Sequence, residues 1–395
     1  MINLTPNPEF ALRKAAVLGS TGSVGTQTLD VIRELGVKVS MLTAGENVHL
    51  LASQIREFSP AVVSVTSERA AASLLEILGS NVPEIIVDKE ELSSAIETTD
   101  ADIIFHSVGG LAGLDSAIAA AKSGKRVGMA NKEAIIAAGD VIFGIMEQSG
   151  GEMIPVDSEH CAVYRCLENR DPANLKKIIL TASGGPFYGK NAVELKNVTA
   201  ADALAHPTWK MGKKITVDSA TLMNKGFEII EAVRLFGVEE NRVDVLIHRQ
   251  SIIHSMIEYN DNTLMAQIGR PDMRDCIRYA ATAPNSARVS CDELDFAKIA
   301  SLTFGAPDTD AFPLLEAARE AIRIGGTAPA ALIAADEEAV DSFLRDEIGF
   351  CDISSLVIET LGCITHDKVI SPESLEYASL KARECAASLI NKYKI

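Results

Sequence analysis

Two carboxylates, Asp157 and Glu159, stand two residues apart directly after a short apolar run that ends at Val156. In an extended segment both side chains would lie on one face. Two oxygen ligands on one face suit a hard divalent cation such as Mg²⁺ or Mn²⁺, provided that a further carboxylate arrives from elsewhere. The alternative is a helix cap, in which Asp157 or Ser158 accepts backbone N–H bonds before a helix over 160–167. Taken alone, this segment favours the cap.

A second group of side chains, between His206 and Glu231, has the composition of a phosphate-binding site. Hydroxyl and amide groups at Ser219, Thr221 and Asn224 can contact phosphate oxygens, and ammonium groups supply charge. The basic members of this stretch are His206, Lys210, Lys213, Lys214 and Lys225. They form the local cation cluster that an acidic protein needs in order to hold an anion.

The same stretch offers a third carboxylate. A helix is predicted to begin near Leu222, and Glu228 and Glu231 lie three residues apart on it, so either could point at the same metal. Three carboxylates together with a phosphate-binding segment favour a metal site at Asp157 over a simple cap.

Two glycine-rich loops complete the set of chemical candidates. Residues 14–18 form an apolar run that ends at a G-x-x-G-x-x-G loop over 19–25, and helical spacing follows over 26–34. Such a loop lets backbone N–H groups at a helix N-terminus approach a pyrophosphate. The commoner spacing is G-x-G-x-x-G, so a tight structural turn is the alternative.

The second loop, 181–187, follows the strand-like run 177–180 and suits an oxyanion, although such a loop is more often just a turn.

Alternating elements position these loops. Short strand-like runs at 37–44, 61–65, 84–87, 102–105 and 126–129 have helical stretches between most of them. This order predicts an α/β fold with a Rossmann-like, doubly wound parallel sheet. Ligands of such sheets bind beyond the carboxyl ends of the strands, where 45–47, 106–107 and 130–133 fall.

Three of the side chains at loops have competing interpretations. Glu46 follows the second strand, where an acidic residue typically binds the ribose 2′-OH of NAD, but it could instead point to solvent. His106 is interpreted first as a partly buried, hydrogen-bonded imidazole. Trp209, the single tryptophan, lies in a loop of turn formers and is interpreted as a cover over a ligand, with a position in the core as the alternative.

The bulk composition narrows the class of protein. A net charge of −17 argues against a nucleic-acid or anionic-membrane binder. The seven cysteines include no C-x-x-C pair, which indicates a reducing compartment. No export signal or membrane-spanning run is apparent. We therefore expect a cytoplasmic protein with a small-molecule substrate.

The chain of 395 residues is too long for one core. Amphipathic patterns at 314–324, 328–343, 353–361 and 372–393 predict a small C-terminal helical bundle. The predicted organisation is a dinucleotide-binding domain over 1–155, an α+β catalytic, metal and substrate domain over 156–300 with a flexible loop at 205–214, and a helical domain over 301–395.

These segments together resemble the 1-deoxy-D-xylulose 5-phosphate reductoisomerase family, whose members use NADPH. The matching pieces are LGSTGSVGTQTLDVI, MANKEAII, PVDSEHCAVYRCL, LTASGGPF, HPTWKMGKKITVDSATLMNKGFEIIEA and QSIIHSMIEY with GRPDMRD. They run from about residue 14 to residue 280. The resemblance implies rearrangement of a ketose phosphate to 2-C-methyl-D-erythritol 4-phosphate by a homodimer.

The resemblance also implies residue roles. Asp157, Glu159 and Glu228 would bind the metal, which would be Mn²⁺, Mg²⁺ or Co²⁺, with Glu231 as a structural neighbour, and Lys132 would lie near the reacting carbonyl. The implied substrate-binding residues are Ser158, Ser183, His206, Trp209, Ser219, Asn224 and Lys225. The implied cofactor-binding residues are Thr21, Gly22, Ser23, Val24, Gly45, Asn47, Asn131, Glu133, Met211, Gly212 and Met273.

Four positions depart from the family's pattern. Glu46 replaces a basic or small polar residue and leaves NADH as an alternative cofactor. His106 stands at a usual Asn, Arg249 at a common Pro, and Asp336 lies in LIAADE where LNAANE is expected. These departures motivate a second hypothesis, a paralogue acting on another ketose phosphate. A third hypothesis, a catalytically silent nucleotide or sugar-phosphate sensor, is disfavoured by the intact carboxylates and Lys132.

Overall fold

The computed structural model describes residues 1–80, 82–209, 211–285, 287 and 293–394. The chain forms two compact units. The first comprises Met1–Ala134, Ile142–Arg170 and Asp272–Cys291, and the second comprises Ile135–Val141, Asp171–Pro271 and Asp292–Ile395. The division into three domains at residues 155 and 300 stays a prediction.

The first unit is built on a seven-stranded sheet in which every neighbouring pair runs parallel. The spatial order is β4-β3-β2-β1-β5-β6-β7, so the direction of winding reverses between β1 and β5. The strands are β1 (Lys14–Leu18), β2 (Lys38–Thr43), β3 (Val62–Ser64), β4 (Glu84–Ile86), β5 (Ile103–His106), β6 (Arg126–Met129) and β7 (Glu152–Pro155). The predicted doubly wound parallel sheet is confirmed, and its switch point lies beside the first glycine loop.

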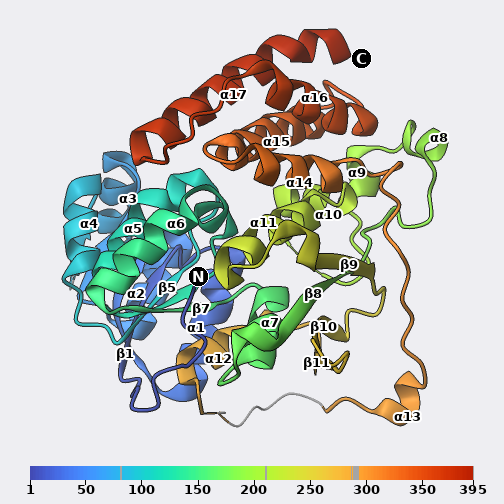
Figure 1. Ribbon diagram of the computed structural model, residues 1–395. Helices are drawn as coiled ribbons and strands as arrows, with labels where there is room; N and C mark the ends of the chain where they lie inside the picture. The colour runs from blue at the N-terminus through green and yellow to red at the C-terminus, as the bar shows by residue number, and fades with distance from the viewer. Residues whose placement is uncertain (81, 210, 286, 288–292, 395) are drawn as a thin grey trace. The chain divides into compact units, whose positions relative to one another are not determined.

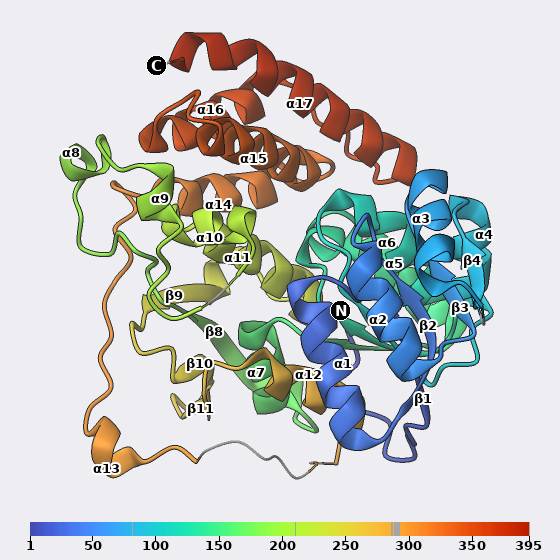
Figure 2. The same ribbon diagram turned by 180° about the vertical axis from the view of Figure 1, so that it is seen from behind.

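Helices cover both faces of this sheet. Figure 1 shows α4 and α5 in front of the strands. Figure 2, the view from the opposite side, shows α1 and α2 in front of the strands. Because both faces are covered, the central strand β1 is almost entirely apolar and buried. The helices whose residues belong wholly or mainly to this unit are α1 (Ser23–Leu35), α2 (Val48–Phe58), α3 (Glu68–Leu78), α4 (Lys89–Glu97), η1 (Leu111–Gly113), α5 (Leu114–Lys122), α6 (Lys132–Ser149), α7 (Ser158–Leu167) and α12 (Met273–Thr282).

The second unit contains a four-stranded sheet of order β11-β10-β8-β9. Strands β8 and β9 are parallel, whereas β10 runs antiparallel to both β8 and β11. Helix α11 (Met223–Phe236) packs on β8 and β9. The strands of this sheet are β8 (Leu175–Ala182), β9 (Val243–Ile247), β10 (Ile253–Tyr259) and β11 (Leu264–Ile268). The other elements of this part of the chain are η2 (Pro172–Asn174), α8 (Ala192–Leu195), α9 (Ala200–Ala203), α10 (Lys213–Ala220), η3 (Glu240–Arg242) and α13 (Phe296–Ile299).

Four C-terminal helices complete the second unit and confirm the predicted bundle (Figure 1). They are α14 (Leu314–Ile324), α15 (Ala328–Leu344), α16 (Phe350–Cys363) and α17 (Pro372–Tyr393). Helix α15 packs against α14, α16, α17 and α10, and its many small alanines are fully buried. None of the described helices is long and apolar enough to cross a bilayer.

Candidate active site

The first glycine loop lies between β1 and α1 in the first unit. Gly19 has φ +81°, and a Cβ on Gly25 would lie 2.2 Å from the carbonyl oxygen of Gly19, so no larger residue fits there. Gly22 caps α1 without a side-chain hydrogen bond, and the first turn of α1 contains no acidic residue. The predicted residues Thr21, Gly22, Ser23 and Val24 therefore form an open helix N-terminus that suits an anion.

The loop after β2 contains the predicted residues Gly45 and Asn47. Asn47 caps α2 by accepting from the N–H of Leu50. The neighbouring Glu46 is exposed, accepts from the hydroxyl of Ser67 at 3.0 Å and pairs with Arg69 at 2.9 Å. These contacts lower the pKa of Glu46, and the hydrogen bond from Arg69 has the largest effect. Glu46 is thus a carboxylate whose charge is already partly balanced by a cation.

Asn131, predicted to bind the dinucleotide, has a structural role that the sequence did not reveal. Its Oδ1 caps α6 by accepting from the N–H of Ala134, and its Nδ2 donates to the carbonyls of Val108 and Gly110. The side chain is buried and ties the loop after β5 to α6. Glu133, in the first turn of α6, is half-buried.

His106 lies at the carboxyl end of β5 and is fully buried rather than partly buried. Its Nε2 lies 2.8 Å from Oγ of Ser116. Burial lowers the pKa of His106 to about 4, so the imidazole is neutral at physiological pH. The predicted hydrogen-bonded imidazole is confirmed, but its side-chain partner lies on α5 (Leu114–Lys122) and not in a loop.

Asp157 is the N-cap of α7, as its own segment favoured, so Glu159 lies in a helix and not in an extended segment. Its Oδ1 accepts from the backbone N–H of Glu159 at 3.1 Å and of His160 at 3.4 Å. The helix consequently starts at Ser158 and places Glu159 in its first turn. The physical reason is that an aspartate before an apolar helical pattern satisfies two otherwise unpaired backbone donors.

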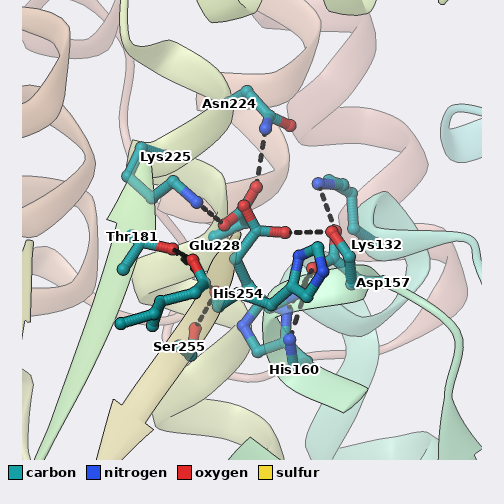
Figure 3. A network of polar contacts seen from close by, with 12 residues as sticks. Lys132, Asp157, His160, Thr181, Asn224, Lys225, Glu228, His254 and Ser255 are labelled. Carbon is teal, nitrogen blue, oxygen red and sulfur yellow. Dashed lines mark hydrogen bonds and ion pairs between the residues drawn. The ribbon is translucent and has the colours of Figure 1, made fainter. Parts of the chain in front are cut away.

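The same carboxylate also contacts two basic side chains, as Figure 3 shows. Nζ of Lys132 donates to Oδ2 of Asp157 at 2.8 Å, and Nδ1 of His160 lies 3.0 Å from Oδ1. Burial opposes ionisation of Asp157, but Lys132 and His160 hold its pKa well below the usual range. Ser158, beside it, donates its hydroxyl to Glu159. Lys132 and the ionised carboxylate of Asp157 thus lie side by side in the first unit.

In the second unit, α11 carries the third candidate carboxylate. Glu228 is buried, and Asn224 and Lys225, one turn earlier, both point at it in Figure 3. Nδ2 of Asn224 donates to Oε1 at 2.6 Å, and Nζ of Lys225 contacts Oε2. Glu231 is buried on the same helix. The structure therefore brings together, on one helix, three of the residues that the sequence singled out.

His254 and Thr181 belong to the network of Figure 3 but were assigned no role from the sequence. Thr181, at the end of β8, donates to the carbonyls of Ile253 and His254 at 2.7 and 2.9 Å. Nε2 of His254 lies 3.0 Å from the carbonyl oxygen of Arg270. Thr181 lies in the LTASGGPF segment and His254 in the QSIIHSMIEY segment, so these two family motifs were the sequence signals that could have identified them.

The predicted phosphate-binding residues Ser183, His206 and Ser219 meet in the second unit. Nε2 of His206 lies 3.0 Å from Oγ of Ser183 and 3.1 Å from Oγ of Ser219. Its Nδ1 accepts from the backbone N–H groups of Thr208 and Trp209 at 3.1 and 2.9 Å. Burial, then the charge of Arg249, lowers the pKa of His206. The ring is therefore neutral, with its hydrogen on Nε2 facing the two hydroxyls.

Arg249, noted only as a departure in the sequence, supports this cluster. Its guanidinium donates to the carbonyl of Ser183 at 3.0 Å and of Gly185 at 2.6 Å. Gly184 and Gly185 have φ of +76° and +62°, and a Cβ on Gly185 would lie 2.6 Å from the carbonyl oxygen of Ser219. Arg249 thus holds the second glycine loop in the conformation that places Ser183.

The lysines at and just before the start of α10 differ in their surroundings. Lys214, expected in the phosphate-binding group, pairs with Asp218 and Asp336. Lys213 is exposed, and Lys210 lies outside the described residues. Among the predicted cofactor residues, Gly212 caps α10, Met211 is half-buried, and Met273 begins α12 and is half-buried. Trp209 is half-buried.

Comparison with known proteins gives matches along most of the chain. Residues 15–139 match the 1-deoxy-D-xylulose 5-phosphate reductoisomerase model, 153–236 match that family's C-terminal domain model, and 268–385 match the DXP reductoisomerase C-terminal domain model. Proteins named 1-deoxy-D-xylulose 5-phosphate reductoisomerase from Ruminiclostridium cellulolyticum and Chlorobium chlorochromatii are 44% and 43% identical, covering 95% and 96% of this chain and 98% and 100% of theirs.

Solved structures agree with these matches. The reductoisomerase of Zymomonas mobilis in complex with NADPH superposes with a TM-score of 0.90 at 38% identity, covering 96% of this chain and 99% of that one. A DOX-P reductoisomerase in complex with NADPH, fosmidomycin and magnesium gives a TM-score of 0.89 at 35% identity, covering 96% and 98%.

Proposed function

Because the chain belongs to the 1-deoxy-D-xylulose 5-phosphate reductoisomerase family, we propose that it rearranges and reduces this sugar phosphate to 2-C-methyl-D-erythritol 4-phosphate. NADPH would supply the hydride, and a divalent cation would be required. The observation that carries the proposal is the conjunction of this family match with the neutral His206 held between two serine hydroxyls and the carboxylates of α7 and α11.

The metal ligands would be Asp157, Glu159 and Glu228. The donor chemistry fits Mg²⁺, Mn²⁺ or Co²⁺, because all three side chains offer carboxylate oxygens and two of them are at most one-tenth exposed. When bound, the cation would polarise the substrate ketone and the neighbouring hydroxyl. Glu231, buried one turn beyond Glu228, would support that helix face.

Basic and polar neighbours of the carboxylates would orient the sugar. Lys132 would donate to the reacting carbonyl, while Ser158, Asn224 and Lys225 would bind substrate oxygens. This proposal is supported by Lys132, Asn224 and Lys225 already pointing at carboxylate oxygens within their own units. An ammonium group so placed can stabilise negative charge that develops on an oxygen during rearrangement.

The substrate phosphate would be bound by Ser183, His206 and Ser219. Their two hydroxyls and the Nε2–H of a neutral imidazole offer three hydrogen-bond donors to an anion. Trp209, whose N–H holds the ring of His206, would cover the bound substrate and exclude water.

NADPH would bind at the open N-terminus of α1, with its pyrophosphate at residues 21–24. Gly45, Asn47, Asn131, Glu133, Met211, Gly212 and Met273 would complete the cofactor site. Arg69 supports NADPH over NADH, because its guanidinium partly balances Glu46 and can attract a 2′-phosphate.

The proposal extends to organisation and compartment. Three domains with limits near residues 155 and 300 are proposed. The gap between the matched segments 15–139 and 153–236 supports the first limit, whereas the third segment, 268–385, begins before the second limit. A homodimer in the cytoplasm is proposed from the family resemblance and the cysteine pattern. The described cysteines form no disulfide among themselves, which fits a reducing compartment.

An assay of NADPH oxidation tests this function. The purified protein, after chelation and dialysis, should oxidise NADPH only when both 1-deoxy-D-xylulose 5-phosphate and Mn²⁺ or Mg²⁺ are added. NADH in place of NADPH measures the cofactor preference. No oxidation under any condition would reject the reductoisomerase, and oxidation that survives chelation would reject the metal assignment. Activity with another ketose phosphate but not with 1-deoxy-D-xylulose 5-phosphate would favour the hypothesis of a paralogue with a different substrate.

A further inference from the structure

A cluster of two buried acids and a partly exposed lysine ties α10 to α15 within the second unit. Nζ of Lys214 lies 2.7 Å from Oδ2 of Asp218 and 2.5 Å from Oδ2 of Asp336. The side chain of Asp336 is 0% exposed and that of Asp218 is 4% exposed. Lys214 and Asp218 lie one turn apart on α10, whereas Asp336 comes from α15.

The charges in this cluster do not balance if both acids are ionised. Two carboxylates and one ammonium leave a buried excess of negative charge, which is costly away from water. In addition, Oδ1 of Asp218 and Oδ1 of Asp336 are buried and accept no hydrogen bond from the described residues. A proton kept on either acid removes the excess charge and supplies a hydrogen-bond donor.

The charges of Asp336 and Lys214 act on Asp218 in opposite directions. Burial and the charge of Asp336 raise the pKa of Asp218 well above its usual range, and Lys214 opposes them. Helix α11 contributes the ring of Phe227, which lies 4.8 Å from Nζ of Lys214. The acid on α9, Asp202, is exposed and bonded to Thr199.

Helix α10 depends on such contacts for its position. It has 8 residues, its cap Gly212 makes no side-chain hydrogen bond, and KKITVDSA includes several weak helix formers. The residue after Asp218 is Ser219, whose hydroxyl meets Nε2 of His206 at 3.1 Å. A displacement of α10 along α15 would therefore move Ser219 directly.

We propose that Asp218 and Asp336 share one proton beneath Lys214 and that this neutral triad is a positioning device that fixes Ser219 for binding an anionic phosphate with His206 and Ser183. The proposal rests on the proposed function in assigning the substrate phosphate to Ser219. Neither acid touches substrate in this account; both act through α10.

The sign of the pH dependence follows from the shared proton. An acid whose pKa is raised in the folded state stabilises that state below its ordinary pKa, and the contribution is lost as pH rises through the raised value. Loss of the proton leaves two buried carboxylates facing one ammonium. We therefore expect weaker phosphate binding, seen as a higher KM with little change in kcat, at the pH where the acid pair titrates.

Two substitutions at one position test the proposal. Asp336→Asn resembles the protonated acid in shape and hydrogen bonding and should keep KM within about twofold of the parent, whereas Asp336→Leu removes the polar contact and should raise KM about tenfold. The value of kcat should stay within about twofold for both, since chemistry is untouched. Asp341→Asn, an exposed aspartate on the same helix, is the matched control and should behave as the parent.

Carboxyl ¹³C NMR of the parent and of Asp336→Asn gives a readout that a merely structural role would not move. One carboxyl of the pair should remain protonated well above the ordinary range in the parent, and that signal should be lost in the variant. Calorimetry with inorganic phosphate, above about pH 7.5 where phosphate is mostly dianionic, should reproduce the order of affinities seen in KM.

Three results would overturn the proposal: both acids titrating at ordinary values, Asp336→Asn impairing KM as strongly as Asp336→Leu, or Asp336→Leu leaving KM and phosphate affinity unchanged. If Asp336→Leu fails to fold, the NMR titration and the Asn variant still decide. If the parent does not act on the sugar phosphate, the proposed function fails, while the NMR and inorganic phosphate measurements still test the triad.

Discussion

At the scale of single residues, Asp157 shows that one carboxylate can cap a helix and contact basic side chains at the same time. Its Oδ1 caps α7 and faces His160, while its Oδ2 accepts from Lys132. The cap and the metal ligand were alternatives in the sequence, because both roles call for an aspartate before a helix. The geometry makes them compatible, since capping fixes the carboxylate that would face the cation.

Replacing Glu159 tests the metal assignment without disturbing this cap. Glu159→Gln keeps the size of the side chain but removes its charge, so we expect kcat to fall about 100-fold or more. NADPH affinity, measured by fluorescence titration, should be unchanged, because α1 and its loop are not altered. Glu147→Gln, an exposed glutamate on α6, serves as the control. A Glu159→Gln enzyme as active as the parent would refute the assigned role.

His106 makes a pH-dependent contribution to stability. Its folded pKa of about 4 lies below the usual value of 6.5, so the unfolded chain binds a proton first as pH falls. The free energy of unfolding should therefore drop between these two pH values, by about 3 kcal/mol at most from this residue. In urea titrations at several pH values, His106→Asn should remove that part of the slope. The exposed His49→Asn should retain it, and an unchanged slope in His106→Asn would contradict the burial argument.

At the scale of elements, the strand–loop–helix unit of β1 and α1 could be predicted because the hydrophobic period changes at the glycines. The limits of α14 were also predictable, since its apolar face repeats regularly between Pro313 and Gly325. Two features could not be predicted. The pairing of Lys214 with Asp336 joins residues 122 positions apart. The sequence also does not show that Asn131 donates to the backbone carbonyls of Val108 and Gly110.

A pair of glycine substitutions tests the first loop as an element. Gly25→Ala would place a Cβ 2.2 Å from the carbonyl oxygen of Gly19, so the loop must shift and NADPH affinity should fall by about tenfold or more. Gly144→Ala in α6 meets nothing within 4 Å and should leave affinity unchanged while stabilising the helix by about 0.5–1 kcal/mol. Equal NADPH affinities in the two variants, measured by fluorescence titration, would contradict the proposed pyrophosphate site.

At the scale of the whole molecule, the family resemblance came from contiguous motifs. The matching family models cover the regions of these motifs except QSIIHSMIEY, at 250–259, which lies between two matched segments. Composition alone gave only an acidic globular protein with a small-molecule substrate. Spacing joined Asp157 with Glu159, but the role proposed for Glu228 connects two segments about 70 residues apart, and that connection came from the motifs together rather than from one local pattern. The family match also brings together three chemical parts, a dinucleotide loop, a phosphate cluster and metal carboxylates, which one reaction needs at once.

The most direct test of this account follows the carbon skeleton. The protein would be incubated with ¹³C-labelled 1-deoxy-D-xylulose 5-phosphate, NADPH and Mn²⁺, and the product examined by ¹³C NMR beside a chelated control. We expect 2-C-methyl-D-erythritol 4-phosphate with a rearranged, branched skeleton, one NADPH oxidised for each product molecule, and neither change in the chelated sample. An unbranched reduced sugar phosphate, or a branched product formed without a divalent cation, would contradict the account.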